Sequence, residues 1–136
     1  MIRFETVGMI EVAKNNPVLT SGSDVTNYSF ITVDGDLYLI ANVITGDDAY
    51  VDGAVIPAGE PLNGFLVEAW KSQKLVVDGK HINGGVEAAT KGATLVAGSD
   101  GKLAANSVPE SGVYFKVTDT GVTLTEPAVK VKVCVA

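Results

Sequence analysis

Short runs of β-forming residues alternate with glycine-containing turn pairs along most of the chain. The pairs include Asp34-Gly35, Asp78-Gly79 and Asp100-Gly101, and the runs between them are rich in Val, Ile, Leu, Thr, Tyr and Phe. Asp-Gly and Asn-Gly accept the positive φ angles of two-residue hairpin turns. Helical periodicity is missing apart from two short stretches. The pattern therefore predicts an all-β fold, a small β-sandwich or barrel of consecutive hairpins with at most one or two short helices.

The clearest predicted hairpin covers Ser29–Ala41, with Asp34-Gly35 as its turn. Pairing Val33 with Asp36 divides its apolar side chains between two faces: Ile31, Val33, Tyr38 and Ile40 on one, and Phe30, Leu37 and Leu39 on the other. A hairpin with one solvent-exposed face should alternate apolar with polar residues, and this one does not. We therefore expect it to be central to the fold or to have one face covered by a partner.

Three further hairpins are predicted from the same turn chemistry. They cover Leu75–Ile82 around Asp78-Gly79, Thr94–Leu103 around Asp100-Gly101, and Val113–Leu124 around Asp119–Gly121.

The last strand is predicted over Val129–Val135, where the valines share one face and Lys130 and Lys132 share the other. Outward lysines are typical of a protected edge strand. Phe65–Lys74 fits a strand or a short helix, and the strand is favoured. Val86–Thr90 fits a single helical turn.

Length and charge narrow the class of protein. The chain has 136 residues and a net charge of -6, so we expect one β domain over residues 1–136 that does not bind nucleic acid, since phosphate binding needs a basic face. No secretory signal is visible, and Asn42 interrupts the longest apolar run, so no membrane segment is expected. Cys134 is the only cysteine, which excludes an internal disulfide and fits synthesis in a reducing cytoplasm.

Candidate catalytic residues are few. Ser99 lies in Ala97–Gly101, which resembles a nucleophile elbow, but the next residues predict a returning strand, so a hairpin turn is favoured. His81 is the only histidine, so it cannot form a multi-histidine metal site, and nothing marks Cys134 as a reactive thiol. We therefore predict no catalytic residue, metal or cofactor, and a protein that is not an enzyme.

Two other residue classes have an ordinary structural interpretation. Aspartates such as Asp34, Asp36, Asp47, Asp48 and Asp52 crowd the turns, but the calcium-loop pattern is missing. Trp70 and the four tyrosines, Tyr28, Tyr38, Tyr50 and Tyr114, could form a sugar-binding platform; packing in the core or at an interface is favoured.

Three segments, Asp52–Glu60, Lys91–Val96 and Asp100–Leu103, contain short sequence patterns. In these patterns a glycine precedes apolar residues, a turn follows, and Gly-Lys-Leu comes after the turn. Over Asp52–Ala104 the chain resembles the head decoration proteins of tailed bacteriophages, a group that includes the lambda-type head stabilisers. It departs from that type because it has no Gly/Pro-rich N-terminal arm. The resemblance implies a virion protein on the capsid exterior that bridges subunits of the major capsid protein, as a homo-oligomer such as a trimer.

The sequence thus favours a structural protein that stabilises a phage capsid. Alternatives are a carbohydrate-binding or host-attachment module, a tail or baseplate structural protein and, least favoured, a small β-barrel enzyme. We expect residues 1–12 to contact the partner by adding a strand to a neighbouring subunit, so that removing Met1–Thr6 weakens binding more than stability. The predicted interface residues are Ile2, Arg3, Phe4, Val7 and Trp70.

Overall fold

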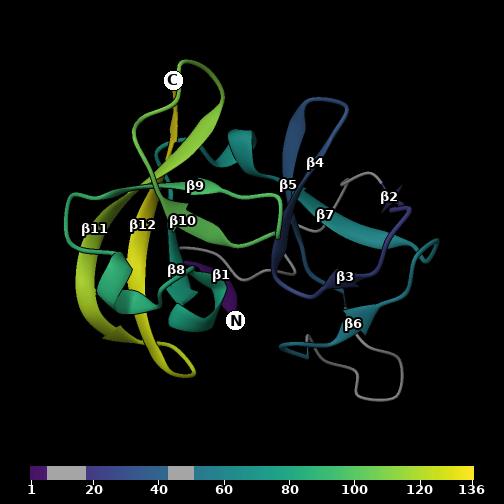
Figure 1. The fold of residues 1–136 in the computed structure, drawn as a ribbon, viewed down its shortest axis with the longest axis horizontal. Coiled ribbons are helices and arrows are strands. Elements are labelled where there is room, and N and C mark those ends of the chain that lie inside the picture. The colour runs from purple at the N-terminus through teal and green to yellow at the C-terminus, as the bar shows by residue number, and fades with distance from the viewer. Residues whose placement is uncertain (6–17, 43–50) are drawn as a thin grey trace.

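The computed structural model describes residues 1–5, 18–42 and 51–136 of the protein (Figure 1). The strands in these residues are β1 (Ile2–Phe4), β2 (Val18–Leu19), β3 (Val25–Thr26), β4 (Ser29–Val33), β5 (Asp36–Ile40), β6 (Val55–Ile56), β7 (Leu62–Leu66), β8 (Lys74–Asp78), β9 (Thr94–Ala97), β10 (Leu103–Ala105), β11 (Val113–Thr123) and β12 (Pro127–Val135). The helices are three short 3-10 turns, η1 (Val67–Trp70), η2 (Gly79–His81) and η3 (Val86–Ala88). The predicted all-β fold is confirmed, with three helical turns in place of one or two.

The described strands form three antiparallel sheets. A six-stranded sheet in the order β1-β8-β12-β11-β9-β10 fills the left half of Figure 1, and a four-stranded sheet in the order β2-β7-β5-β4 lies to its right. Strands β3 and β6 form a small separate pair. None of the helices in the described part is long and apolar enough to cross a membrane.

The β4–β5 hairpin confirms the predicted register and turn. Val33 pairs with Asp36 across Asp34-Gly35, and the two turn residues have φ angles of 51° and 84°. The left-handed region is common for glycine and tolerated by aspartate, which explains why this pair closes the hairpin.

The same hairpin lies between two hydrophobic cores. Phe30 and Leu39 point into the larger core, which also holds Phe115 of β11, with its ring centroid 5.2 Å from that of Phe30. Tyr38 and Ile40 point into a smaller core beneath the four-stranded sheet. The predicted division of the hairpin into two apolar faces is confirmed, and its own chain covers the buried part of both faces.

The β9–β10 hairpin is also confirmed. Leu103 pairs with Ala97, and the turn between them contains Gly101 at φ 82°. This turn packs against the edge of β4, where the Phe30 N–H donates to the Gly101 carbonyl at 2.9 Å.

Two predicted hairpins are wrong. Asp78-Gly79 ends β8 and begins η2, because the Asp78 side chain is fully buried and bonded to the distant Thr125. Val113–Thr123 is one continuous strand, in which register shifts between Val117 and Val122 mark bulges. The Asp119–Gly121 segment therefore bends β11, and the turn to β12 follows later.

The C-terminal alternation is confirmed, but its predicted place in the sheet is wrong. Val129, Val131 and Val133 are buried in the larger core. Strand β12 lies between β8 and β11, so it is not an edge strand. Lys130 instead forms an ion pair with Glu5, at 3.3 Å between Nζ and Oε1.

Two short ambiguous segments resolve as helical turns. Strand β7 ends at Leu66 and η1 follows it, so the strand favoured over Phe65–Lys74 is wrong for most of that range. The helical turn expected in Val86–Thr90 is confirmed as η3.

Candidate functional site

Two of the predicted interface residues, Ile2 and Phe4, lie in a sheet of their own chain. Strand β1 pairs with β8 in the same chain, with Ile2 opposite Val77 and Phe4 opposite Leu75. Ile2 is 0% exposed and Phe4 is 2% exposed, both within the larger core. These side chains are therefore core residues. The edge of β8 that a partner strand could extend is already occupied by β1.

The other predicted interface residues do not form one surface with them. Arg3 is exposed on β1, and Trp70 is half-buried in η1 with its ring centroid 4.5 Å from that of Phe4. Val7 lies outside the described residues. In the described residues 1–5, Arg3 and Glu5 are exposed, whereas the side chains of Ile2 and Phe4 are buried.

Among the described residues, the aromatic side chains do not form the exposed surface that a sugar-binding platform needs. Tyr28 and Tyr38 are buried, while Trp70 and Tyr114 are each half-buried. Tyr50 lies outside the described part of the chain. Aromatic residues therefore serve mainly the core.

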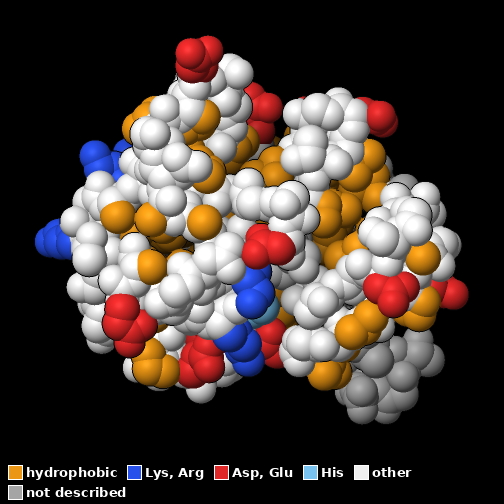
Figure 2. Space-filling model, in the orientation of Figure 1, with side chains coloured by type: hydrophobic (Ala, Val, Ile, Leu, Met, Phe, Trp, Pro, Cys, Tyr) orange, Lys and Arg blue, Asp and Glu red, His pale blue; other side chains and the backbone are white. Residues whose placement is uncertain are grey.

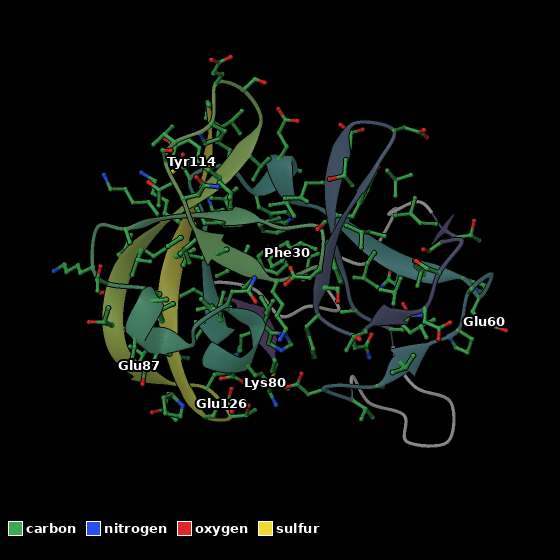
Figure 3. The ribbon with its side chains drawn as sticks, in the orientation of Figure 1. Phe30, Glu60, Lys80, Glu87, Tyr114 and Glu126 are labelled. Carbon is green, nitrogen blue, oxygen red and sulfur yellow. The ribbon has the colours of Figure 1, made fainter. Side chains whose placement is uncertain are left out.

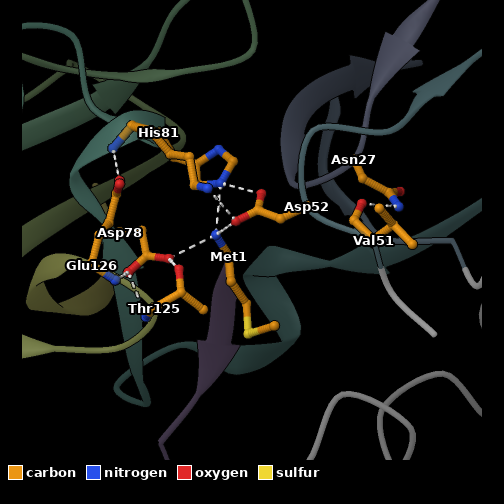
Figure 4. A network of polar contacts seen from close by, with 9 residues as sticks. Met1, Asn27, Val51, Asp52, Asp78, His81, Thr125 and Glu126 are labelled. Carbon is orange, nitrogen blue, oxygen red and sulfur yellow. Dashed lines mark hydrogen bonds and ion pairs between the residues drawn. The ribbon is translucent and has the colours of Figure 1, made fainter.

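A polar network at the start of β1 is the first candidate site (Figure 4). The Met1 amino group donates to the carboxylates of Asp52 and Asp78, the latter at 2.9 Å. It also lies 2.9 Å from Nε2 of His81, and that nitrogen lies 3.0 Å from Oδ1 of Asp52. A neutral imidazole can accept from the amino group or donate to the carboxylate through Nε2, but it cannot do both at once.

Asp78 connects the network to the β11–β12 turn. Its Oδ2 accepts from the Thr125 hydroxyl, and its Oδ1 accepts from the backbone N–H groups of Thr125 at 3.2 Å and Glu126 at 3.3 Å. Glu126 in turn accepts from the Lys80 backbone N–H at 2.8 Å. Burial of the Asp78 carboxylate raises its pKa, but the bonds from Thr125 and Met1 outweigh that cost and hold the pKa below its usual value.

Electrostatics fix the protonation states of the rest of the network. Burial lowers the pKa of His81, the positive charge of the Met1 amino group lowers it further, and Asp52 offsets only part of this. The pKa of Asp52 is raised by burial but lowered more by bonds from the Met1 amino group and from Lys80, whose Nζ lies 2.9 Å away. At neutral pH the network therefore contains a neutral imidazole and two ionised carboxylates.

The network is suited to holding segments together. A general base needs a nitrogen that a substrate proton can reach, and Nε2 of His81 is already shared by two groups. The candidate nucleophiles are engaged elsewhere: Ser99 lies in the β9–β10 turn, and the Cys134 thiol donates to the Lys132 carbonyl at 3.7 Å. Among the described residues no group of three or more His, Cys, Asp or Glu side chains is placed to hold a metal ion.

The second candidate site is a groove of about 520 Å³ between the two large sheets. One wall is the tip of the β4–β5 hairpin, the other is the loop at 106–112, and the end of β9 lies between them. Figure 2 shows this recess between two lobes at the top of the view, with hydrophobic side chains inside and acidic ones at both tips. The polar network lies at the opposite edge, where Figure 3 labels Lys80 and Glu126.

The groove is lined by apolar and acidic side chains and by the neutral polar ones of Thr32, Asn106 and Ser107. The apolar residues are Leu37, Val96, Ala97, Val108, Pro109 and Val113. Val108 is 55% exposed, which is unusual for a large apolar side chain of this protein. Three exposed carboxylates, Asp36, Glu68 and Glu110, also line the groove, and no described residue forms an ion pair with any of them.

Sequence reasoning missed this groove. Leu37 was assigned to an apolar face of its hairpin, and Val108-Pro109 carries no turn or strand pattern that marks it as exposed. The one available signal is that Asn106–Gly112 is polar and turn-rich around a single valine, which is typical of a surface loop.

Comparison with known proteins identifies no relative. No protein-family model, curated protein or solved structure matches the chain. The groove and the polar network are therefore interpreted from their own geometry.

Proposed function

We propose that this protein is a structural protein that binds the outer surface of a phage capsid and stabilises the shell by bridging subunits of the major capsid protein. The observation that carries this proposal is the groove, because it offers, on an open surface, apolar side chains and carboxylates that form no ion pair with a described residue. Aromatic, apolar and charged groups in such recesses are what protein interfaces use for anchoring and orientation.

The rest of the molecule supports a structural role. The polar network joins β1, η2 and the β11–β12 turn through bonds to buried or partly buried charges. A network of this kind holds β1 and the β11–β12 turn against the end of β8. A rigid scaffold with a recess on one side suits a protein that acts by contact, and many copies on a symmetric shell would multiply a modest single contact.

Among the alternatives, a glycan-binding module is less well supported, because Tyr28 and Tyr38 are core residues. A tail or baseplate structural protein would use the same groove and differs from our proposal only in its location. We also propose that the protein is not an enzyme.

The test is co-sedimentation of the purified protein with empty capsids assembled from the major capsid protein of the same genome. We expect saturable binding at a fixed ratio to capsid subunits, and size-exclusion chromatography with light scattering to show whether the bound form is a trimer. Absence of binding to capsids, with labelling of tails in virion images, would replace this proposal by the tail or baseplate alternative.

A further inference from the structure

We infer that the groove binds an extended, basic segment of the partner protein, which adds as a strand to the open edge of β4. The inference rests on the proposed function, since it names the chemistry of the capsid-protein segment that the groove would take. It rests on three features of the site: an open strand edge, an apolar floor and an acidic lining.

The open edge follows from the hairpin register. Strand β4 is the last strand of the four-stranded sheet, with β5 as its neighbour on one side. In a hairpin with a two-residue turn, the residues flanking the turn exchange backbone hydrogen bonds, and alternate residues then point away. Because Val33 and Asp36 flank the turn, the N–H and C=O groups of Thr32 point away from β5.

A contact earlier in β4 supports this assignment. Phe30 is two residues before Thr32, so its backbone groups should also point away from β5. Its N–H donates to Gly101 of the β9–β10 turn, at 2.9 Å, on the side opposite β5. The turn thus covers the edge as far as Phe30, whereas Thr32 is exposed and lines the groove.

The floor beside this edge is continuous and contains the apolar side chains of Leu37 and Ala97, with Gly98 and Ser99 beyond them. A second depression of about 320 Å³ runs along β4 and shares Thr32, Leu37 and Ala97 with the groove. An added strand would place alternate side chains against this floor, while its backbone pairs with Thr32. Backbone bonds would supply affinity, and the floor would select apolar side chains at alternate positions.

The charge of the lining identifies the partner as basic. Asp36, Glu68 and Glu110 come from three separate segments, and the described lining contains no Lys or Arg. Like charges held close together repel, so a segment with Lys or Arg between its apolar residues gains from all three carboxylates. The same charges oppose a polyanion such as nucleic acid, and the described lining has no aromatic ring on which a sugar could stack.

The direct test uses a capped octapeptide of alternating lysine and valine as the probe. In nitrogen-15 NMR titrations we expect the largest shift at the Thr32 amide and slower hydrogen exchange there. An octapeptide of alternating glutamate and valine should produce neither change. Shifts centred away from β4 and the groove would overturn the inference.

Two variants separate the backbone from the charge contribution. Thr32→Pro removes the outward N–H without removing a β4–β5 bond, and proline is tolerated at such edge positions. It should weaken binding of the lysine-valine peptide about tenfold, the effect of losing roughly one hydrogen bond. Glu68→Lys with Glu110→Lys should weaken it by a similar or larger factor, whereas the matched control Glu60→Lys with Glu87→Lys, at two exposed carboxylates outside the groove, should not.

The double charge variant keeps the test valid if Thr32→Pro does not fold, since its residues are exposed. Peptide binding unchanged by the double variant would overturn the inference. The capsid assay distinguishes the two levels of proposal. If both groove variants still bind capsids, the groove is not the docking site, and the proposed function stands. If the wild type binds the peptide through the groove but does not bind capsids, the proposed function is rejected and the inference is retained.

Discussion

The polar network and the groove both contain several carboxylates, but those of the network are bonded within the protein and those of the groove are exposed. In the network, Asp78 is 0% exposed and accepts bonds from Thr125, Glu126 and the Met1 amino group. In the groove, Glu68 and Glu110 are exposed and form no ion pair with a described residue. The carboxylates of the network are bonded within the fold, whereas those of the groove are available to bind another molecule.

Burial explains the difference. A carboxylate that leaves water must recover the lost hydration through hydrogen bonds and opposite charges, or it does not remain ionised. The buried end of β8 meets this requirement with donors from two segments, the N-terminus and the β11–β12 turn. The groove carboxylates keep their water, so they add little to stability and retain their capacity to bind. The predictions that follow test this division, beginning with the largest expected effect.

Asp78→Ala should lower the free energy of unfolding by about 3–5 kcal/mol, because it removes the buried acceptor of Thr125 and Glu126 and one of the two carboxylates that pair with the Met1 amino group. Urea denaturation at neutral pH measures the change. Glu87→Ala removes an exposed carboxylate outside both regions and should stay within about 0.5 kcal/mol of the wild type. A loss below about 1 kcal/mol for Asp78→Ala would show that the network does not hold the fold.

Phe4→Ala should cost about 3 kcal/mol, near the lower end for a buried phenylalanine, because half-buried Trp70 can move into part of the space. Thermal melting would measure it. Capsid binding by the folded fraction should be unchanged, since Phe4 is buried in the larger core and does not line the groove. Weakened binding with unchanged melting would restore the N-terminal segment as the docking site.

Acidification should destabilise the protein in two steps. The pKa of His81 is below its ordinary value of 6.5, so below pH 6.5 the unfolded chain binds more protons than the folded protein and stability falls. The pKa values of Asp52 and Asp78 are also lowered, which adds a second loss below pH 3.8. Melting curves across this range measure both steps, and His81→Gln should remove the first. A melting temperature that is constant between pH 6.5 and pH 3.8 in the wild type would contradict the role assigned to His81.

The parts of the fold that the sequence predicted are those specified locally. The β4–β5 hairpin follows from a turn pair that tolerates positive φ and from side chains on its two faces. The C-terminal strand follows from its two-residue period. Both depend on residues within a few positions of one another.

The parts that escaped prediction depend on distant contacts. Asp78-Gly79 has the sequence of a hairpin turn, but the Asp78 carboxylate bonds to Thr125, which is 47 residues away. The groove forms only when the loop at 106–112 lies opposite the β4–β5 hairpin. No local pattern specifies either juxtaposition, so the predicted interface was assigned to the terminal strand, whose apolar residues pack inside.

The smallest expected effect is on the stability of groove variants. Glu68→Gln with Glu110→Gln removes two exposed charges that have no ion-pair partner among the described residues, so the free energy of unfolding should change by less than about 0.5 kcal/mol. Because the net charge is -6, reduced self-repulsion can make the change slightly stabilising. Asp52→Asn is the matched contrast: it removes one charge of the same sign, but one that contacts Lys80 and the Met1 amino group, and it should cost about 1.5–3 kcal/mol. Urea denaturation of both variants beside the wild type measures the difference. Equal losses would mean that the groove carboxylates are already paired within the protein, and the contrast between a closed and an open set of charges would fail.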